Sequence, residues 1–178
     1  MRNDVDHILF TESDSAAKVQ ELGKRITEDY SGKAPFLIGV LKGCFIFMSD
    51  LARAIDLPCD IDFMAVSSYG SGSTTTGAVQ IKKDLSRDIE GRDVIIIEDI
   101  LDSGITLSYL TKYLENRDPA SIKICTLMDK PARRQSEIRA DYVGFVCPDE
   151  FVVGYGLDYD EKYRNLPYIG ILKREIYE

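Results

Sequence analysis

The residues best suited to chemistry lie together between positions 94 and 106 of the chain. An apolar run is followed there by the acids Glu98 and Asp99, by a third acid, Asp102, and by a small, hydroxylated group at 103–106. A glycine-containing loop that enters a helix binds anions through its N–H groups, and the helix dipole adds to that attraction. Acids beside an anion site need a different partner, such as sugar hydroxyls or a divalent cation. The segment therefore predicts a site for a sugar phosphate with Mg²⁺, although a buried strand with an acidic loop also occurs in α/β proteins without a ligand.

The better known phosphate-binding loops do not fit this chain. Residues 72–77 have the glycine spacing of a P-loop, but Ala78 and Val79 stand where that motif needs lysine and a hydroxyl residue. Residues 70–72 lack the third glycine of a dinucleotide fingerprint. The 94–106 segment thus remains the strongest candidate for the anion site.

The segment at 94–107 resembles the motif with which type I phosphoribosyltransferases bind phosphoribosyl pyrophosphate (PRPP). The resemblance covers the chain from about residue 20 to the end, and it implies Mg²⁺-dependent purine salvage: transfer of the phosphoribosyl group from PRPP to hypoxanthine or guanine, giving IMP or GMP and pyrophosphate. Four further motifs match the hypoxanthine-guanine branch of that family in order and approximate spacing: Leu41-Lys42-Gly43, Ser68-Tyr69-Gly70, Asp129-Lys130-Pro131 and residues 151–159.

The resemblance assigns one group of residues to PRPP and the metal. It implies that the loop at 103–106 holds the 5′-phosphate, that the two adjacent acids contact the ribose hydroxyls directly or through Mg²⁺, and that Lys42-Gly43 contacts pyrophosphate, with a non-proline cis peptide there. For Glu98 a simple salt bridge, and for Lys42 a solvated helix entry, are the alternatives. The implied PRPP contacts are Lys42, Gly43, Glu98, Asp99, Asp102, Ser103, Gly104, Ile105, Thr106 and Arg164, and the implied metal ligands are Glu98, Asp99 and Asp158.

A second group is assigned by resemblance to the purine. Asp102 is the candidate catalytic base, or hydrogen-bond acceptor, at purine N7. Lys130 is expected to select a 6-oxo purine, because an ammonium group donates hydrogen bonds and never accepts them. Phe151 is expected to stack on the base, although an aromatic residue in an apolar run is more often part of a core. The implied purine contacts are Lys130, Phe151, Val152 and Asp158.

Ser68 and Tyr69 begin a polar loop rich in glycine, serine and threonine. We expect residues 69–82 to close over the site when substrates are bound, because excluding water protects the reactive ribosyl centre from hydrolysis. A plain hairpin connection is the alternative.

Short apolar runs alternate with helical patterns along the chain. This alternation predicts a single α/β domain, residues 1–178, with a doubly wound and mostly parallel sheet. A small hood from the terminal segments and a mobile active-site loop complete the expected architecture. Helices are expected at 13–30, 45–54 and within 107–114, and strands at 36–41, 61–66, 78–82, 94–97, 122–127, 142–146, 151–153 and 169–172.

The composition excludes several classes of function. The net charge of −8 argues against a broad surface for nucleic acid or anionic membranes. The four cysteines form no C-x-x-C pair, and no apolar run is long enough for export or membrane spanning, so we expect a cytoplasmic protein with reduced thiols. The only histidine, His7, lies near the start of the chain, so a histidine base is not expected.

Two alternative functions share this fold. A nucleotide-sensing regulator of the same fold would need a basic surface for RNA, and the acidic chain has only short basic groups at 82–83 and 132–134. A related transferase could prefer another base: Lys130 opposes adenine, but xanthine differs from guanine only at the 2-position and stays open. PRPP and a 6-oxopurine are the expected partners, and relatives of this kind form homodimers or homotetramers.

Overall fold

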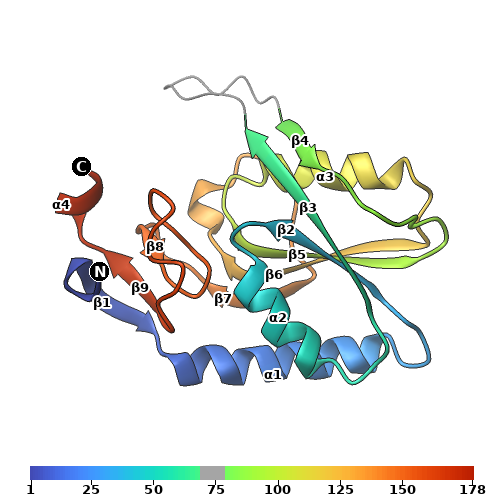
Figure 1. The fold of residues 1–178 in the computed structure, drawn as a ribbon, viewed down its shortest axis with the longest axis horizontal. Coiled ribbons are helices and arrows are strands. Elements are labelled where there is room, and N and C mark those ends of the chain that lie inside the picture. Colours follow the sequence, from blue (N-terminus) through green and yellow to red (C-terminus); the bar gives the residue numbers. More distant parts are fainter. Residues whose placement is uncertain (69–78) are drawn as a thin grey trace.

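A six-stranded sheet forms the centre of the protein (Figure 1). The computed structural model describes residues 1–68 and 79–178. Neighbouring strands pair in parallel, except that β4 runs antiparallel to β3. The predicted doubly wound, mostly parallel sheet is therefore confirmed. In spatial order the strands are β4 (Val79–Lys83), β3 (Asp60–Ser68), β2 (Phe36–Leu41), β5 (Asp93–Leu101), β6 (Ser121–Asp129) and β7 (Tyr142–Val146).

Helices cover both faces of this sheet. Helices α1 (Glu12–Asp29) and α2 (Phe45–Ala54) lie on one face, and α3 (Ile105–Glu115) lies on the other (Figure 1). Side chains alternate along β2, so that Leu37 packs in the α1/α2 core and Ile38 packs in the α3 core. Because both faces are buried, the central strands are continuous apolar runs.

A second, three-stranded antiparallel sheet forms the hood. It pairs β1 (Val5–Phe10) with β9 (Ile169–Leu172), and β9 with β8 (Val152–Val153); a 3-10 turn at Arg2–Asp4 precedes it and α4 (Arg174–Tyr177) follows it. The two chain ends lie at this same end of the molecule (Figure 1). The expected hood from the terminal segments is therefore confirmed.

The strand expected at 94–97 is longer than predicted. Its pairing with β2 stops at Ile97, but its pairing with β6 continues to Leu101, so β5 runs through Glu98 and Asp99 instead of ending before them. The two acids consequently lie on a strand whose β2 side is unpaired. The other predicted elements agree with the structure to within a few residues, the largest shifts being at the ends of β6, β3 and α3. The polar loop that includes Tyr69 lies mostly outside the described residues.

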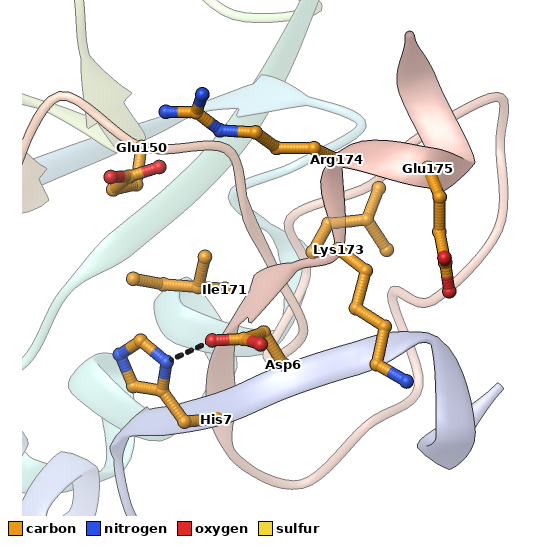
Figure 2. A pocket seen from close by; sticks show the side chains of 8 residues that line it. Asp6, His7, Glu150, Ile171, Lys173, Arg174 and Glu175 are labelled. Carbon is orange, nitrogen blue, oxygen red and sulfur yellow. Dashed lines mark hydrogen bonds and ion pairs between the residues drawn. The ribbon is translucent and has the colours of Figure 1, made fainter.

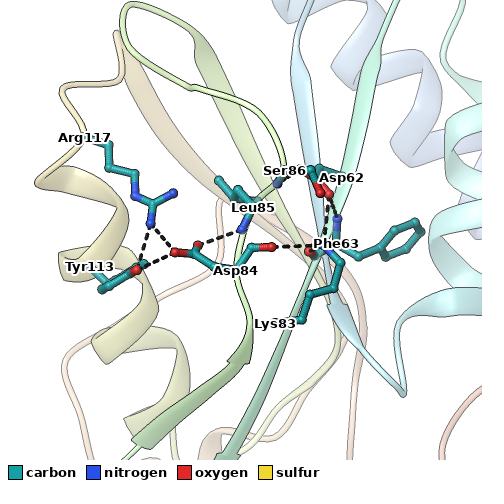
Figure 3. A network of polar contacts seen from close by, with 8 residues as sticks. All are labelled: Asp62, Phe63, Lys83, Asp84, Leu85, Ser86, Tyr113 and Arg117. Atoms are coloured by element: carbon teal, nitrogen blue, oxygen red, sulfur yellow. Dashed lines mark hydrogen bonds and ion pairs between the residues drawn. The ribbon is translucent and has the colours of Figure 1, made fainter.

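A polar network fixes the chain beyond β4 to the rest of the sheet (Figure 3). The Asp62 carboxylate, on β3, accepts hydrogen bonds from Ser86 N at 2.6 Å and from Lys83 Nζ at 3.3 Å. Lys83 also donates to the carbonyl oxygen of Phe63 at 2.6 Å. On the α3 side, Asp84 accepts from Tyr113 Oη and Arg117.

Asp62 gives a test of this network. Burial raises the pKa of Asp62, but hydrogen bonds from Phe63 and Ser86 and the charge of Lys83 outweigh it, so that the pKa is lowered overall. Asp62→Ala should lower the free energy of unfolding at pH 7 by about 1–3 kcal/mol, because it leaves buried donors without an acceptor. This difference in the free energy of unfolding should have its full size above the unfolded-state pKa of about 3.9. It should disappear as the pH falls through the lower folded-state pKa.

Urea unfolding at several pH values measures this difference. The exposed Asp56→Ala variant is the control and should stay within about 0.5 kcal/mol of the parent. A loss that did not change between pH 7 and pH 3 would show that the charge of Asp62 does not contribute.

Candidate functional site

Two adjoining cavities lie at the carboxyl ends of the parallel strands, where open α/β sheets bind ligands. Their volumes are about 460 Å³ and about 180 Å³, and both are lined by Asp99, Ile100, Asp102 and Asp158. The predicted residues that line the larger cavity are Lys42, Gly43, Glu98, Asp99, Asp102, Ser103, Gly104, Thr106, Asp158 and Arg164. Those that line the smaller one are Asp99, Asp102, Lys130, Phe151, Val152 and Asp158.

Two predicted residues, Ile105 and Ser68, are not among the residues that line either cavity. Ile105 is the first residue of α3, and its N–H donates to Ser103 Oγ at 3.4 Å. Ser68 is the last residue of β3. Tyr69 lies outside the described residues, so the predicted loop contacts remain predictions.

The turn between β5 and α3 is shaped to approach an anion. Gly104 caps α3 with a φ of 79°, in the left-handed region where a side chain is unfavourable. A Cβ atom there would lie 2.4 Å from Ser136 Oγ and 2.6 Å from Ile138 Cγ2. Together with Ser103 and Thr106 this glycine lines the larger cavity at the amino end of an eleven-residue helix. The arrangement suits a phosphate group.

Arg134 supports this turn through hydrogen bonds to the backbone, and the sequence analysis did not single out this residue. Its guanidinium donates to the carbonyl oxygens of Asp102 at 2.9 Å, Leu101 at 3.2 Å and Ile138 at 2.8 Å, and it pairs with the carboxylate of Asp129. Only the planar, five-donor guanidinium can serve so many acceptors. In the sequence, Arg134 belongs to a basic loop that gives no sign of these contacts.

Glu98 and Asp99 form a buried acidic pair. Glu98 is only 9% exposed, and burial raises its pKa well above the usual value, with a further rise from the neighbouring Asp99 charge. Burial likewise raises the pKa of Asp99, while the positive charge of Arg164 opposes that rise. The pair therefore favours a cation or hydrogen-bond donors in the larger cavity.

Two glycines allow close packing around the turn that follows β2. A Cβ on Gly43 would lie 1.7 Å from Asp99 Oδ2, and a Cβ on Gly156, whose φ is 105°, would lie 2.2 Å from the carbonyl oxygen of Gly43. The peptide bond between Leu41 and Lys42 is cis, as the resemblance implied. The Lys42-Gly43 turn is thereby packed directly against the acidic pair.

Two cationic side chains, Lys42 and Arg164, line the larger cavity. Arg164 Nη2 lies 3.0 Å from Asp158 Oδ1, and its Nη1 donates to the carbonyl oxygen of Gly156 at 2.8 Å. Among the described residues its buried Nε has no hydrogen-bond partner. Lys42 Nζ lies 2.8 Å from Glu161 Oε2. An unpartnered buried donor beside a polar cavity is consistent with an anionic ligand.

The smaller cavity has a donor and an aromatic ring. Lys130 is only 7% exposed, and its Nζ donates to the carbonyl oxygen of Glu150 at 2.8 Å, which joins the end of β6 to the hood. Phe151 stacks on Tyr177 at a centroid distance of 5.1 Å and meets Tyr159 edge-on at 5.4 Å. An ammonium group with donors to spare beside a flat apolar ring suits a planar heterocycle with a carbonyl group.

A further cavity of about 510 Å³ lies in the hood (Figure 2). The side chains of Asp6, His7, Glu150 and Arg174 border it, and His7 Nδ1 lies 2.7 Å from Asp6 Oδ2. None of the predicted site residues lines it. The side chains that line it are partly exposed and carry charges of both signs, so they do not indicate a particular class of ligand.

Comparison with known proteins agrees with this geometry. A family model described as phosphoribosyl transferase domain matches residues 8–160. The chain is 54% identical to a hypoxanthine-guanine phosphoribosyltransferase of Bacillus subtilis, covering all of this chain and 99% of that protein. A crystal structure of a hypoxanthine phosphoribosyltransferase from Staphylococcus aureus superposes with a TM-score of 0.97 at 55% identity, covering 100% of this chain and 97% of that one.

The chain also matches longer proteins. It is 56% identical to the bifunctional protein TilS/HprT of Listeria monocytogenes over 99% of its own length, but it spans only 27% of that relative.

The family model and the relatives matched over their full length show that the chain belongs to the phosphoribosyltransferase family, and within that family to the hypoxanthine-guanine phosphoribosyltransferases. In the described part of the chain, no helix is long and apolar enough to cross a membrane.

We expect the buried acidic pair to lower the stability of the ligand-free protein, although the same carboxylates suit the binding of a ligand. Glu98→Gln should raise the free energy of unfolding of the ligand-free protein at pH 7 by about 0.5–2 kcal/mol, because it removes a buried charge that has no cation. A raised folded-state pKa favours the folded protein below the unfolded-state value of about 4.3, and this contribution is lost as the pH rises. The advantage of the variant should therefore grow with pH above that value.

Thermal unfolding in the presence of a chelator tests this. The exposed Glu90→Gln variant is the control and should change little. A destabilised Glu98→Gln variant would show that the carboxylate is satisfied within the ligand-free fold.

We expect Arg134 to affect turnover by positioning the turn, without itself contacting the substrate. Arg134→Lys should lower kcat/KM about ten- to a hundredfold, because a single ammonium cannot hold Asp102 and the anion-binding turn in place. The neighbouring Arg133, which pairs with Asp149 at the surface, supplies the control Arg133→Lys, expected to stay within about twofold. Steady-state kinetics with both variants decides; equal activities would remove Arg134 from any positioning role.

Proposed function

We propose that the protein transfers the phosphoribosyl group of PRPP to hypoxanthine or guanine, forming IMP or GMP and releasing pyrophosphate. The observation that carries this proposal is the meeting of the two cavities at Asp99, Asp102 and Asp158. One cavity has an anion-binding turn and acids, and the other has a buried lysine and an aromatic ring. A sugar phosphate and a flat base bound side by side would meet at these acids.

The larger cavity suits PRPP along its length. The turn at 103–106 would hold the 5′-phosphate, the acidic pair would accept hydrogen bonds from the ribose hydroxyls, and Lys42 with Arg164 would bind the pyrophosphate. The unpartnered Nε of Arg164 supports an anion at that end. Arginine suits this task because its guanidinium can donate two parallel hydrogen bonds to a phosphate.

The residues present also fit Mg²⁺. Among the described residues, no three histidine, cysteine or acidic side chains lie close enough to hold a metal by themselves. This agrees with the usual binding of Mg²⁺, through one or two carboxylates together with substrate phosphates and water. One or two of the three candidate ligands, Glu98, Asp99 and Asp158, would supply oxygen atoms, and phosphate oxygens of the substrate and water would complete the coordination. When bound, Mg²⁺ would neutralise the charge that develops on the departing pyrophosphate.

The reaction would rely on position and charge instead of a covalent intermediate. As the bond from ribose C1′ to the pyrophosphate oxygen breaks, the bond from C1′ to purine N9 forms. Asp102, which lines both cavities, would accept the proton of N7. Arg134 binds the carbonyl oxygen of this residue and would hold it in place.

Base selection would come from the smaller cavity. Lys130 Nζ already donates to Glu150 and lies 3.6 Å from Asp149 Oδ1, so its third proton could be directed to a 6-oxo group. Phe151 would stack on the purine, Val152 would bind the base through its backbone, and Asp158 would lie at the edge of the cavity. Xanthine, which shares the 6-oxo group, stays an alternative substrate.

We also propose a domain organisation, a cellular compartment, a class of partners and an oligomeric state. A single domain of residues 1–178 agrees with the shared hydrophobic clusters of the sheet and helices. The four free cysteines support a reducing compartment such as the cytoplasm. The acidic charge supports small-molecule substrates instead of nucleic acid. A homodimer or homotetramer is proposed by resemblance alone.

A base panel tests the proposed function. We expect nucleotide formation from PRPP and Mg²⁺ with hypoxanthine and guanine, but not with adenine or uracil, and we expect a chelator to abolish it. Lys130→Ala should lower kcat/KM for both bases about 10- to 100-fold, because it removes a charged hydrogen bond to the substrate. Its PRPP affinity, measured by calorimetry, should change less than about twofold.

Lys123→Ala is the matched control, because Lys123 pairs with Asp141 outside both cavities. Equal losses of PRPP and purine binding in Lys130→Ala would argue against a base-selecting lysine. Turnover of uracil, or no turnover at all, would contradict the proposed function and make RNA binding the next measurement.

A further inference from the structure

Glu161 contacts both of the cations assigned above to pyrophosphate. Its Oε2 atom lies 2.8 Å from Lys42 Nζ and 3.5 Å from Arg164 Nη2. One carboxylate oxygen therefore lies within ion-pair distance of two positive groups that come from separate parts of the chain. An anionic ligand bound by the same two cations would have to displace this carboxylate or tolerate its negative charge.

The backbone at Glu161 is unusual for this residue type. Tyr159 and Lys162 exchange hydrogen bonds of 3.2 Å and 3.0 Å, which closes a two-residue hairpin with Asp160 and Glu161 at its tip. Their φ angles are 51° and 61°, and such tight hairpins generally carry asparagine and glycine at these positions. A left-handed conformation in a non-glycine residue is costly, and such strain is concentrated at functional sites. The hairpin alone does not require a long acidic side chain at its tip.

The ion pairs of Glu161 are weak enough to be exchanged. The side chains of Lys42 and Glu161 are 66% and 62% exposed, so water and salt screen their attraction. Arg164 also has a shorter contact, of 3.0 Å, to Asp158, and this contact does not involve Glu161. A multiply charged pyrophosphate could therefore replace Glu161 without disrupting the rest of the site.

We propose that Glu161 is an internal competitor of pyrophosphate, occupying Lys42 and Arg164 in the ligand-free protein and returning to them as pyrophosphate leaves. This inference rests on the proposed function. It assigns Glu161 a role in product release and in setting the affinity for PRPP, with no role in the chemical step. The competition follows from charge, because two anions cannot share two cations as favourably as one can.

The test is calorimetric titration of the full chain with inorganic pyrophosphate in excess Mg²⁺. Glu161→Gln should bind pyrophosphate about two- to fivefold more tightly at low ionic strength, the range that a largely exposed ion pair supports, and the difference should shrink as salt is added. Product inhibition by pyrophosphate should strengthen by the same factor. Binding of ribose 5-phosphate, which lacks the pyrophosphate group, should not change.

Two further variants separate this effect from others. Glu161→Gly removes the carboxylate while suiting the positive φ, so it should also bind pyrophosphate more tightly. Asp160→Asn makes the same change of charge one residue away, and should leave binding unchanged, because within residues 1–68 and 79–178 the Asp160 side chain pairs only with Lys162. Tighter binding in both Glu161 variants but not in Asp160→Asn supports the inference.

Unchanged or weaker binding in the Glu161 variants, with clear binding by the parent protein, overturns the inference and leaves the proposed function intact. An equal gain in Asp160→Asn also overturns it, because the effect would then be one of general charge. Absence of pyrophosphate binding in the parent protein, with Mg²⁺ present, contradicts the placement of pyrophosphate at Lys42 and Arg164. The base panel described above then decides whether the proposed function itself fails.

Discussion

The burial of two adjacent carboxylates at the end of β5 is the constraint on which the site depends. Burial raises the pKa values of both Glu98 and Asp99, and the charge of Asp99 raises that of Glu98 further, so the ligand-free protein holds the pair at a cost. A fold optimised only for stability would not place two acids there. Their cost is offset when a ligand supplies hydroxyl donors or a cation, and the site is thus built to favour its occupied state.

The sheet makes this arrangement possible by ending its pairings unevenly. The pairing of β2 with β5 stops at Ile97, while β6 follows β5 to Leu101. The acids are therefore held firmly on one side and exposed to the Lys42-Gly43 turn on the other. Close packing at Gly43 and Gly156 then brings the hood segment against the sheet, and with it Asp158 and Arg164. Two cavities with shared walls result from this packing.

The charged side chains around the cavities fall into two kinds. Arg134 is largely buried, and its contacts to backbone carbonyl oxygens fix the anion-binding turn. Lys42 and Glu161 are exposed, and their pairing is weak enough to give way to a ligand. Under the proposed function, a turn held by buried contacts and ion pairs that exchange readily would suit binding followed by product release.

The sequence alone determined the order of the elements and singled out most of the polar residues that line the two cavities. Short apolar runs that alternate with helical patterns predict strands buried on both faces, and the acids, hydroxyls and glycine of 98–106 have few other uses in that order. Local patterns of this kind depend on neighbours along the chain, so they can be recognised without coordinates.

Tertiary structure decided how those residues are held. The contacts of Arg134 and Glu161 join segments about 30 and 119 positions apart, and neither residue differs in type or spacing from an ordinary surface charge. The extension of β5 through its acids depends on which neighbouring strand stops first, which no local pattern encodes. Charge pairing and strand pairing act through space, and for that reason only the folded chain shows which residues contact the turn and the cations of the site.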